Sequence, residues 1–369
     1  MKKNLFLAAL AGVALVGCAK NEVAQVTDDS QREITFSTPV LALNTKADEI
    51  GGTQFPNDKD FSVFAYYTEG AFSSVSSSLS LYMDDVTVTK GDYDNITIGQ
   101  GGWHATPAYY WPKNTNSKLT FDAYYPTALG FTSTAADGLK LADYTAPYDY
   151  DDQNDVMYAD RAFDKTFSDQ EGDSNTDYDG VDIKFNHAMS VVKIFVKAKD
   201  ATAAGVIKVK SITLKNIAQT GTFSQSYTTN GTGAVTSGWN VTYTAPLATY
   251  APTSAAAGYS SSTEITASVA QYGKNMIVLP QSFATGGAVN AEIEIVYYIK
   301  NGGATGPEVE QKYSLSLAGS DHKVDGGAQI TAWEMGKRYN YTITFAVDEI
   351  FLAPSIDDWD NVNVTVPTI

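Results

Sequence analysis

Apolar and polar residues alternate with a period of two in many short segments of this chain. Residues 33–37 are the first such segment, and Ile34 and Phe36 are its apolar positions. Alternation of this kind is typical of a β-strand with one buried face. No stretch shows a sustained period of 3.6 residues, so we expect few helices, all of them short. The alternation recurs at residues 61–66, 119–124, 191–196, 212–214, 293–299 and 339–345.

The residue types in and between these segments predict an all-β fold. Thr, Val, Ile and Tyr dominate the alternating segments, whereas Gly, Asn, Asp and Pro fill the connections, as strands and hairpin turns require. Many short strands with polar connections are typical of β-sandwiches. Because a length of 369 residues suits two domains, we predict two β-sandwich domains in tandem.

Two segments of unusual composition interrupt the strand pattern. Residues 149–182 are strongly acidic and poor in apolar residues, and we interpret them as a loop-rich crossing between domains at residues 47–180 and 181–369. Acidic oxygens could hold Ca²⁺ there, but the segment lacks the Gly and the terminal Glu of an EF-hand loop, so a calcium site and a solvated loop both remain open. Residues 245–262 are rich in Ala, Ser and Thr and predict a long exposed loop.

The N-terminus has the composition of an export signal. Two lysines precede an apolar run at residues 5–16, which is too short to span a bilayer, since a span needs about 20 residues. The run ends in Leu-Val-Gly-Cys at residues 15–18, which matches the bacterial lipobox. We predict a signal peptide at residues 1–17 and lipidation of Cys18, whose acyl chains would anchor the protein to the outer membrane. A chance cysteine after an ordinary signal peptide is the alternative.

Composition and charge exclude several classes of partner and site. The chain has 42 acidic against 25 basic residues, a formal net charge of −17 and no basic patch, so we expect no nucleic-acid partner. Its single Cys cannot form a disulfide within the chain. The three histidines, His104, His187 and His322, lie far apart in the sequence. We therefore predict no histidine-rich metal centre, and we assign no metal ligand and no cofactor.

Motifs for catalysis are also missing from the sequence. It contains no Gly-x-Ser-x-Gly elbow, no His-Glu-x-x-His and no glycine-rich phosphate loop before a helix. We predict no catalytic residue and no enzyme activity, and we interpret His187 as a core or capping histidine. A set of aromatic residues could stack on sugar rings or fill a sandwich core, and both interpretations stay open: Trp103, Tyr109, Tyr110, Trp111, Tyr124 and Tyr125.

Short motifs follow one another along the chain in a definite order. Each is weak alone, but together they cover nearly the whole sequence. They are the lipobox and the segments 34–36, 61–66, 111–112, 121–126, 155–159, 185–190, 278–281, 333–341 and 356–359. This ordered set resembles the fimbrillin family of Bacteroidales, the subunits of type V pili.

The resemblance implies a fold, a route of export and a mode of assembly. Its members have two transthyretin-like β-sandwich domains and are exported as lipoproteins. A trypsin-like protease on the outer surface cuts the subunit after a basic residue, which releases the lipid and the first strand. The groove that opens then accepts a strand from another copy or from a related fimbrial subunit.

The segment after the first strand contains a cleavage site that suits this scheme. Residues 44–52 are polar and contain glycine, as in an exposed loop that proteases cut. Lys46 is their only basic residue, so we predict cleavage between Lys46 and Ala47 and a propeptide at residues 18–46 that includes Ile34 and Phe36. The best-known family members are cut after Arg. A cut at Arg32 is the rival, but it would leave the first strand in place.

The C-terminal tail offers a replacement strand. Residues 362–366 alternate strictly, which places Val362, Val364 and Val366 on one face. We predict a donor strand at about residues 360–369, preceded by a hinge at Asp357, Asp358 and Trp359. A terminal edge strand that pairs within its own domain is the alternative.

Three functions compete at this point. The first is a structural subunit of a cell-surface fimbria that supports adhesion. The second is a tip adhesin or an anchor subunit of the same fimbria. The third is a surface lipoprotein that binds glycans through its aromatic residues.

Overall fold

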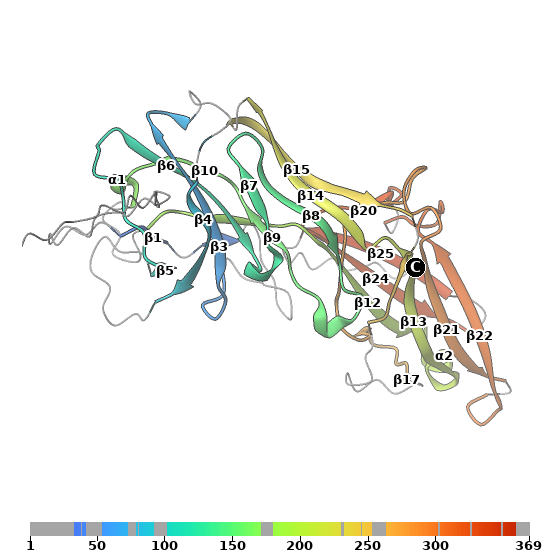
Figure 1. Ribbon diagram of the computed structural model, residues 1–369. Helices are drawn as coiled ribbons and strands as arrows, with labels where there is room; N and C mark the ends of the chain where they lie inside the picture. Colours follow the sequence, from blue (N-terminus) through green and yellow to red (C-terminus); the bar gives the residue numbers. More distant parts are fainter. Residues whose placement is uncertain are drawn as a thin grey trace, which may run out of the picture. The chain divides into compact units, whose positions relative to one another are not determined.

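The structure is a computed structural model in which strands account for most of the described residues. It describes residues 33–37, 39–41, 54–72, 79, 81–91, 102–170, 180–229, 232–244, 246–252, 263–301, 303–324, 327–347 and 350–358. These residues lie in one compact unit that begins at Glu33. Within them the only α-helices are α1 (Phe167–Gln170) and α2 (Ala201–Val206). Two short 3-10 helices, η3 (Thr127–Leu129) and η4 (Tyr150–Asp152), complete the helical part. The all-β prediction is confirmed (Figure 1).

The N-terminal part of the unit is built around a nine-stranded sheet. Its strand order is β1-β5-β4-β3-β6-β9-β11-β2, and β10 pairs with β6 beside this path. The strands are β1 (Thr35–Phe36), β2 (Val40–Leu41), β3 (Phe61–Glu69), β4 (Leu81–Lys90), β5 (Trp103–Thr106), β6 (Ser117–Tyr125), β9 (Met157–Ala159), β10 (Ala162–Lys165) and β11 (Lys184–His187).

A four-stranded sheet follows the order β15-β14-β8-β7 and joins strands that are distant in the sequence. Its members are β7 (Thr132–Thr134), β8 (Gly138–Thr145), β14 (Thr220–Thr229) and β15 (Thr232–Thr242). Phe131, Leu139, Leu141 and Phe223 from this region share one hydrophobic cluster with Phe64 of β3. The four-stranded sheet therefore packs against the face of β3 that bears Phe64.

Both faces of β3 are buried, which differs from the half-buried strand that its alternation predicts. Phe61, Val63 and Ala65 belong to one hydrophobic cluster, whereas Phe64 and Tyr66 belong to two others. Even Ser62 is buried. The difference arises because β3 is a central strand with a core on each side, so its polar positions are covered as well.

The C-terminal part is a β-sandwich of two further sheets. One has the order β18-β12-β24-β25 with β19 beside β12, and the other has the order β16-β13-β21-β22 with β17 beside β13. A small sheet pairs β20 with β23. The strands are β12 (Ser190–Ala198), β13 (Ile207–Ile217), β16 (Ala248–Tyr250), β17 (Thr263–Glu264), β18 (Ala270–Gln271), β19 (Met276–Val278), β20 (Gln281–Ser282), β21 (Glu292–Lys300), β22 (Glu308–Ser316), β23 (Ala332–Trp333), β24 (Lys337–Phe345) and β25 (Ile350–Asp358).

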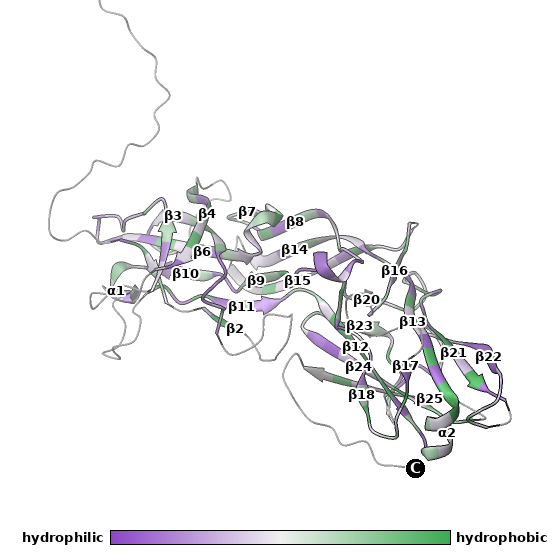
Figure 2. Cartoon of the chain, turned by 90° about the horizontal axis from the view of Figure 1, so that it is seen from below, coloured by the Kyte–Doolittle hydropathy of each residue, from purple (hydrophilic) through white to green (hydrophobic). Residues whose placement is uncertain are grey.

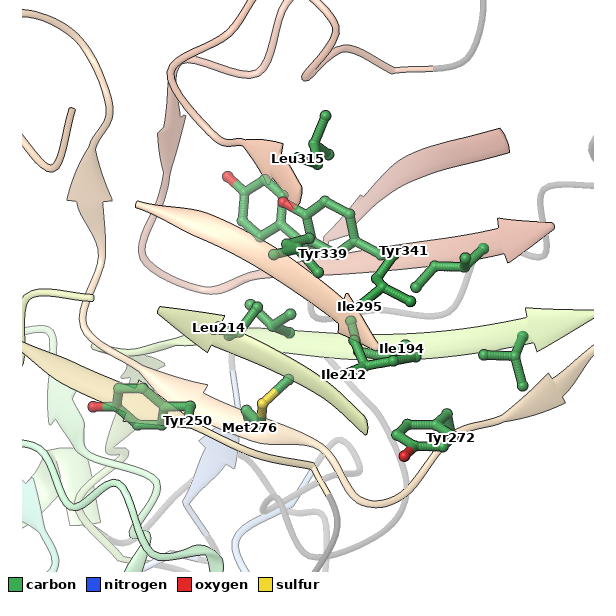
Figure 3. Packing of buried hydrophobic residues seen from close by; sticks show 14 of the residues in the cluster. Ile194, Ile212, Leu214, Tyr250, Tyr272, Met276, Ile295, Leu315, Tyr339 and Tyr341 are labelled. Atoms are coloured by element: carbon green, nitrogen blue, oxygen red, sulfur yellow. The ribbon is translucent and has the colours of Figure 1, made fainter. Parts of the chain in front are cut away.

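A single hydrophobic cluster fills the space between these two sheets. Ile194 of β12 and Tyr341 of β24 meet Ile212 of β13 and Ile295 of β21 in it (Figure 3). In Figure 2 the strands carry both green and purple segments, because apolar residues alternate with polar ones along them. The alternation at 191–196, 212–214, 293–299 and 339–345 thus marks strands that bury one face in this core.

The two segments of unusual composition contain more structure than their sequences predict. Residues 149–182 contribute β9 and β10 to the nine-stranded sheet, so the prediction of a loop-rich crossing is wrong for the part that pairs with β6. Residues 248–250 form β16, with Tyr250 fully buried, although an exposed loop was expected there. Pairing with neighbouring strands overrides the polar local composition in both segments. The domain limits at 47–180 and 181–369 stay a prediction.

Candidate functional site

The first strand lies at the meeting point of the two ends of the nine-stranded sheet. On one side β1 pairs antiparallel with β5, with Phe36 opposite Trp103. The same side is extended by a bridge between Glu33 and Tyr110 and by a hydrogen bond of 2.7 Å from the Ile34 amide to the Tyr109 carbonyl.

The opposite side of the same segment pairs with residues around β11. The Val181 amide donates to the Thr35 carbonyl at 2.9 Å, and the Ser37 amide donates to the Val181 carbonyl at 3.2 Å. Further along, β2 runs parallel to β11, with Val40 opposite Lys184. Because β1 begins the strand order and β2 ends it, residues 33–41 join the two ends of the sheet. We call residues 33–41 the closing segment.

The closing segment is anchored by apolar side chains in the core of this sheet. Ile34 and Phe36 are both 0% exposed, and Leu41 is 5% exposed. The ring of Phe36 makes edge-to-face contacts with Phe61 at 5.8 Å and Phe121 at 5.6 Å. Such aromatic pairs contribute about 0.5–1.5 kcal/mol each beyond their burial. The buried Thr35 shows that the segment is covered on its other face too.

Gly180 allows the closing segment to approach its neighbour this closely. A Cβ atom at this position would lie 2.3 Å from the Phe36 carbonyl carbon and 2.3 Å from the Ser37 nitrogen. Both of these are backbone atoms, so a larger residue would force the two chains apart. The sequence shows only a glycine in an acidic stretch, and it gives no sign that the residue faces Phe36.

Polar contacts hold the rim of the closing segment. Glu33 Oε1 lies 3.1 Å from His104 Nδ1, and Ser37 Oγ donates to Asp182 Oδ1 at 2.7 Å. The Phe55 amide donates to the Pro39 carbonyl at 2.8 Å. A backbone hydrogen bond therefore joins the chain segments on either side of residues 42–53.

Most of the other residues predicted for the site lie outside the part of the chain that the structure describes. These are Cys18, Lys46, Ala47, Val362, Val364 and Val366. The rival site Arg32 and the hinge residue Trp359 lie outside it as well. The predicted hinge residues Asp357 and Asp358 instead form the end of β25, where their backbone pairs with β24. The described chain ends with β25, which pairs antiparallel with β24 up to Asp358, so the predicted donor strand follows directly after an ordered strand.

The aromatic residues considered for sugar stacking are largely internal. Trp103 and Tyr124 are 0% exposed and Trp111 is 5% exposed, so none of these three presents a free ring face. The hydroxyl of Tyr124 donates to Asp85 Oδ1 at 2.5 Å, and burial, together with this carboxylate, raises the pKa of Tyr124. The residues that could still stack on a sugar ring are the partly exposed tyrosines Tyr109, Tyr110 and Tyr125.

One histidine outside the closing segment lies in the core. His187 is buried and its Nδ1 lies 2.9 Å from Asp155 Oδ2, which is the position of a core histidine. Within the described ranges, no three His, Cys, Asp or Glu side chains are grouped so as to hold a metal ion. None of the helices in that part of the chain has the length and apolarity needed to cross a membrane.

Comparison with known proteins identifies similar folds at low sequence identity. A fimbrial protein from Bacteroides vulgatus ATCC 8482 is 16% identical with a TM-score of 0.55, and the match covers 89% of this chain and 99% of that one. A candidate cell adhesion protein from Bacteroides uniformis ATCC 8492 is 17% identical with a TM-score of 0.50, covering 91% and 100%. These likenesses concern the fold. Comparison with curated protein sequences finds no significant match.

The sequence itself carries the assignment to a family. Residues 45–359 match the sequence model described as fimbrillin-like, which covers most of the chain. The match begins after the closing segment and ends one residue beyond β25. The motif order, the all-β fold and this match agree, and the chain belongs to the fimbrillin-like family.

Proposed function

We propose that this chain is the precursor of a structural subunit of a cell-surface fimbria that polymerises by strand exchange. Membership of the fimbrillin-like family supports the fimbrial role and assembly with other fimbrial subunits. The observation that carries the exchange step is that the closing segment joins both ends of the nine-stranded sheet. Its departure would leave a slot with strand edges on both sides.

The proposal assigns a transient anchor and a cut to the N-terminus. Residues 1–17 would be removed at export, and acylated Cys18 would hold the precursor at the outer membrane. A trypsin-like protease would then cut between Lys46 and Ala47, in the segment between Leu41 and Gln54. Maturation would leave two domains at residues 47–180 and 181–369. The backbone hydrogen bond from Phe55 to Pro39 supports this site, because it joins the described residues on either side of the predicted cut.

If the closing segment left, the acceptor protein would lose buried apolar contacts, and backbone groups beside the slot would lose their hydrogen-bond partners. Re-exposure of Ile34 and Phe36 would cost about 3–6 kcal/mol, at about 1.5–3 kcal/mol for each large apolar side chain. The amide and carbonyl groups of β5 and Val181 would lose their partners as well, and such open edges template pairing with another strand. The vacant slot therefore favours a replacement.

The tail of a second copy would supply that replacement. Val362, Val364 and Val366 on one face could fill the positions that Ile34 and Phe36 leave, while the main chain pairs with both edges. A contact between the tail of one copy and the slot of the next is heterologous, and a heterologous contact that does not close into a ring produces a filament.

The decisive experiment treats purified precursor with a trypsin-like protease and follows both the new N-terminus and the size of the product. We expect Ala47 as the first residue and filaments in electron micrographs. The variant Lys46→Arg should behave in the same way, whereas Lys46→Ala should stay uncut and unpolymerised. Protein that begins at Ala47 but remains monomeric would contradict strand exchange.

The same experiment separates a stalk subunit from an anchor or a tip. An anchor subunit would retain acylated Cys18 and remain uncut within isolated fibres, and a tip subunit would accept a strand without donating one. Mass spectrometry of subunits from shed fibres identifies an anchor, because it measures the N-terminal residue and the acyl mass directly. Immunogold labelling shows whether the chain lies along the fibre, as a stalk subunit would, or only at its end, as a tip would.

A further inference from the structure

A long uncharged stretch stands out in this acidic chain. Between Lys215 and Glu264 the sequence contains no Asp, Glu, Lys or Arg, although charged residues make up 18% of the whole. The stretch is rich in Thr, Ser, Gly and Ala and contains both β14 and β15. An uncharged surface in a protein with a net charge of −17 is the place where two copies repel each other least.

The strand β15 forms an exposed edge of its sheet. It pairs with β14 in regular register from Thr242 opposite Thr220 to Val235 opposite Tyr227, and among the described strands β14 is its only partner (Figure 1). Val235 is 44% exposed, and Thr236 and Asn240 are exposed as well. A row of backbone groups on this side is therefore available for another strand.

The other long edge strands in the described part of the chain carry protective features that β15 lacks. The edge strand β22 contains Glu308, Glu310 and Lys312, and Figure 2 draws such hydrophilic residues in purple. The edge strand β25 contains Pro354 and ends in two aspartates. Charged residues and proline are the usual means by which proteins prevent edge pairing. β15 has neither, and its pairing with β14 is unbroken from residue 235 to residue 242.

The edge is held in place before any partner arrives. Trp239 Nε1 donates to the Ala188 carbonyl at 2.6 Å, and its ring packs against Tyr144 at 5.5 Å and Phe223 at 5.6 Å. Phe223 itself is fully buried. β15 is thus fixed to the core, and pairing along it would cost little further ordering.

We propose that β15 is a homotypic docking edge, which pairs antiparallel with β15 of a second copy about a two-fold axis. Two identical strands related by a two-fold axis perpendicular to them run antiparallel, and the contact is self-complementary. Main-chain hydrogen bonds supply the attraction without any charged group. A basic partner would instead be drawn to the acidic surfaces of the chain. The contact uses neither the closing segment nor the tail, so it goes beyond strand exchange and joins copies that exchange does not connect.

Sedimentation of the full chain in a nonionic detergent tests the pairing. We expect a monomer–dimer equilibrium that tightens between about 0.1 M and about 1 M salt, because salt screens the repulsion between acidic copies. Thr236→Lys and Asn240→Lys should each weaken dimerisation at least tenfold. Gln311→Lys on the protected strand β22 is the matched control, since it changes the net charge equally and should leave the dimer unchanged. Circular dichroism checks that all three variants fold.

Disulfide trapping gives a second readout that does not depend on affinity. Single cysteines at Thr236→Cys, Ser237→Cys and Gly238→Cys lie near the centre of β15, and at least one should form a dimer linked between identical positions under mild oxidation. Gln311→Cys and the parent chain, whose only thiol is Cys18, provide the background. A parent protein that stays monomeric at both salt concentrations, or a dimer that is insensitive to both lysine variants, overturns the proposal. Filament formation by cut Thr236→Lys protein should persist, so the two proposals fail independently.

Discussion

Gly180 is the single residue on which the fit of the closing segment depends most directly. We predict that Gly180→Ala lowers the free energy of unfolding of the precursor by about 1–3 kcal/mol, because the new Cβ would meet the backbone at Phe36 and Ser37. Urea titration measures the loss. Gly205→Ala in α2 is the matched control, since nothing lies within 4 Å of its Cβ position, and it should be neutral or gain up to about 1 kcal/mol. Equal effects of the two variants would contradict the close approach.

His322 gives the unfolding free energy a pH dependence of known sign. It is 0% exposed, its Nδ1 lies 2.6 Å from the Leu317 carbonyl, and its Nε2 accepts from the Tyr341 hydroxyl at 2.7 Å. Burial lowers the pKa of His322 to about 4, from 6.5. As the pH falls below 6.5, His322 becomes protonated in the unfolded chain but stays neutral in the folded chain. The free energy of unfolding therefore decreases as the pH is lowered.

We expect the acid loss from His322 to reach about 3 kcal/mol between pH 7 and pH 4. Urea titrations across that range measure it. His322→Asn should reduce the difference between the two pH values by that amount, even if the variant is less stable throughout. A slope that does not change in His322→Asn would show that another group is responsible.

The buried pair of Asp122 and Arg161 ties β6 to the segment before β8. Arg161 Nε and one terminal nitrogen donate to Asp122 at 2.8 and 2.7 Å, and the guanidinium also donates to the carbonyls of Thr134 and Ala135. Removal of one partner leaves a buried charge, so Asp122→Ala should cost about 3–5 kcal/mol in a thermal or urea unfolding experiment. Asp58→Ala, at an exposed ion pair, should change stability by less than about 0.5 kcal/mol.

At the scale of elements, the alternating pattern predicted the core strands and missed the uncharged hairpin. Residues 61–66 and 339–345 lie in β3 and β24, since the apolar side chains that set the period also fill the cores. β14 and β15 contain mostly Thr, Ser and Gly, whose hydropathy varies too little to show a period. These strands form because β14 pairs with β8, a partner about 80 residues away in the sequence.

The closing segment should behave as an exchangeable element. We predict that a synthetic peptide of residues 33–41 inhibits polymerisation of cut protein, because it occupies the slot that the tail of another copy would enter. Light scattering follows the polymerisation. The same peptide with Phe36→Ala should be much weaker, since it loses burial worth about 1.5–3 kcal/mol and the two edge-to-face contacts of Phe36. Equal inhibition by both peptides would show that they act elsewhere.

At the scale of the whole molecule, the proposed strand exchange would make donor and acceptor roles separable. Uncut full-length chain would donate its tail but could not accept one, and cut chain lacking residues 360–369 would accept but could not donate. We predict that their mixture forms tail-to-slot heterodimers that do not extend into filaments, whereas neither protein alone forms a tail-to-slot complex. Size-exclusion chromatography with mass measurement detects them. Filaments from cut protein without residues 360–369 would place the donor strand elsewhere.

The sequence by itself determined the fold class, the family and the apolar character of Ile34 and Phe36, and it predicts the export signal with Cys18. All of these depend on local composition, short motifs or a period of two. Only the tertiary structure decided that residues 33–41 join β5 to the region of β11, that Gly180 faces Phe36 and that β15 has one side without a partner among the described strands. Each of these depends on which distant segments become neighbours, and that is fixed by strand pairing across the folded chain rather than by the residues adjacent in sequence.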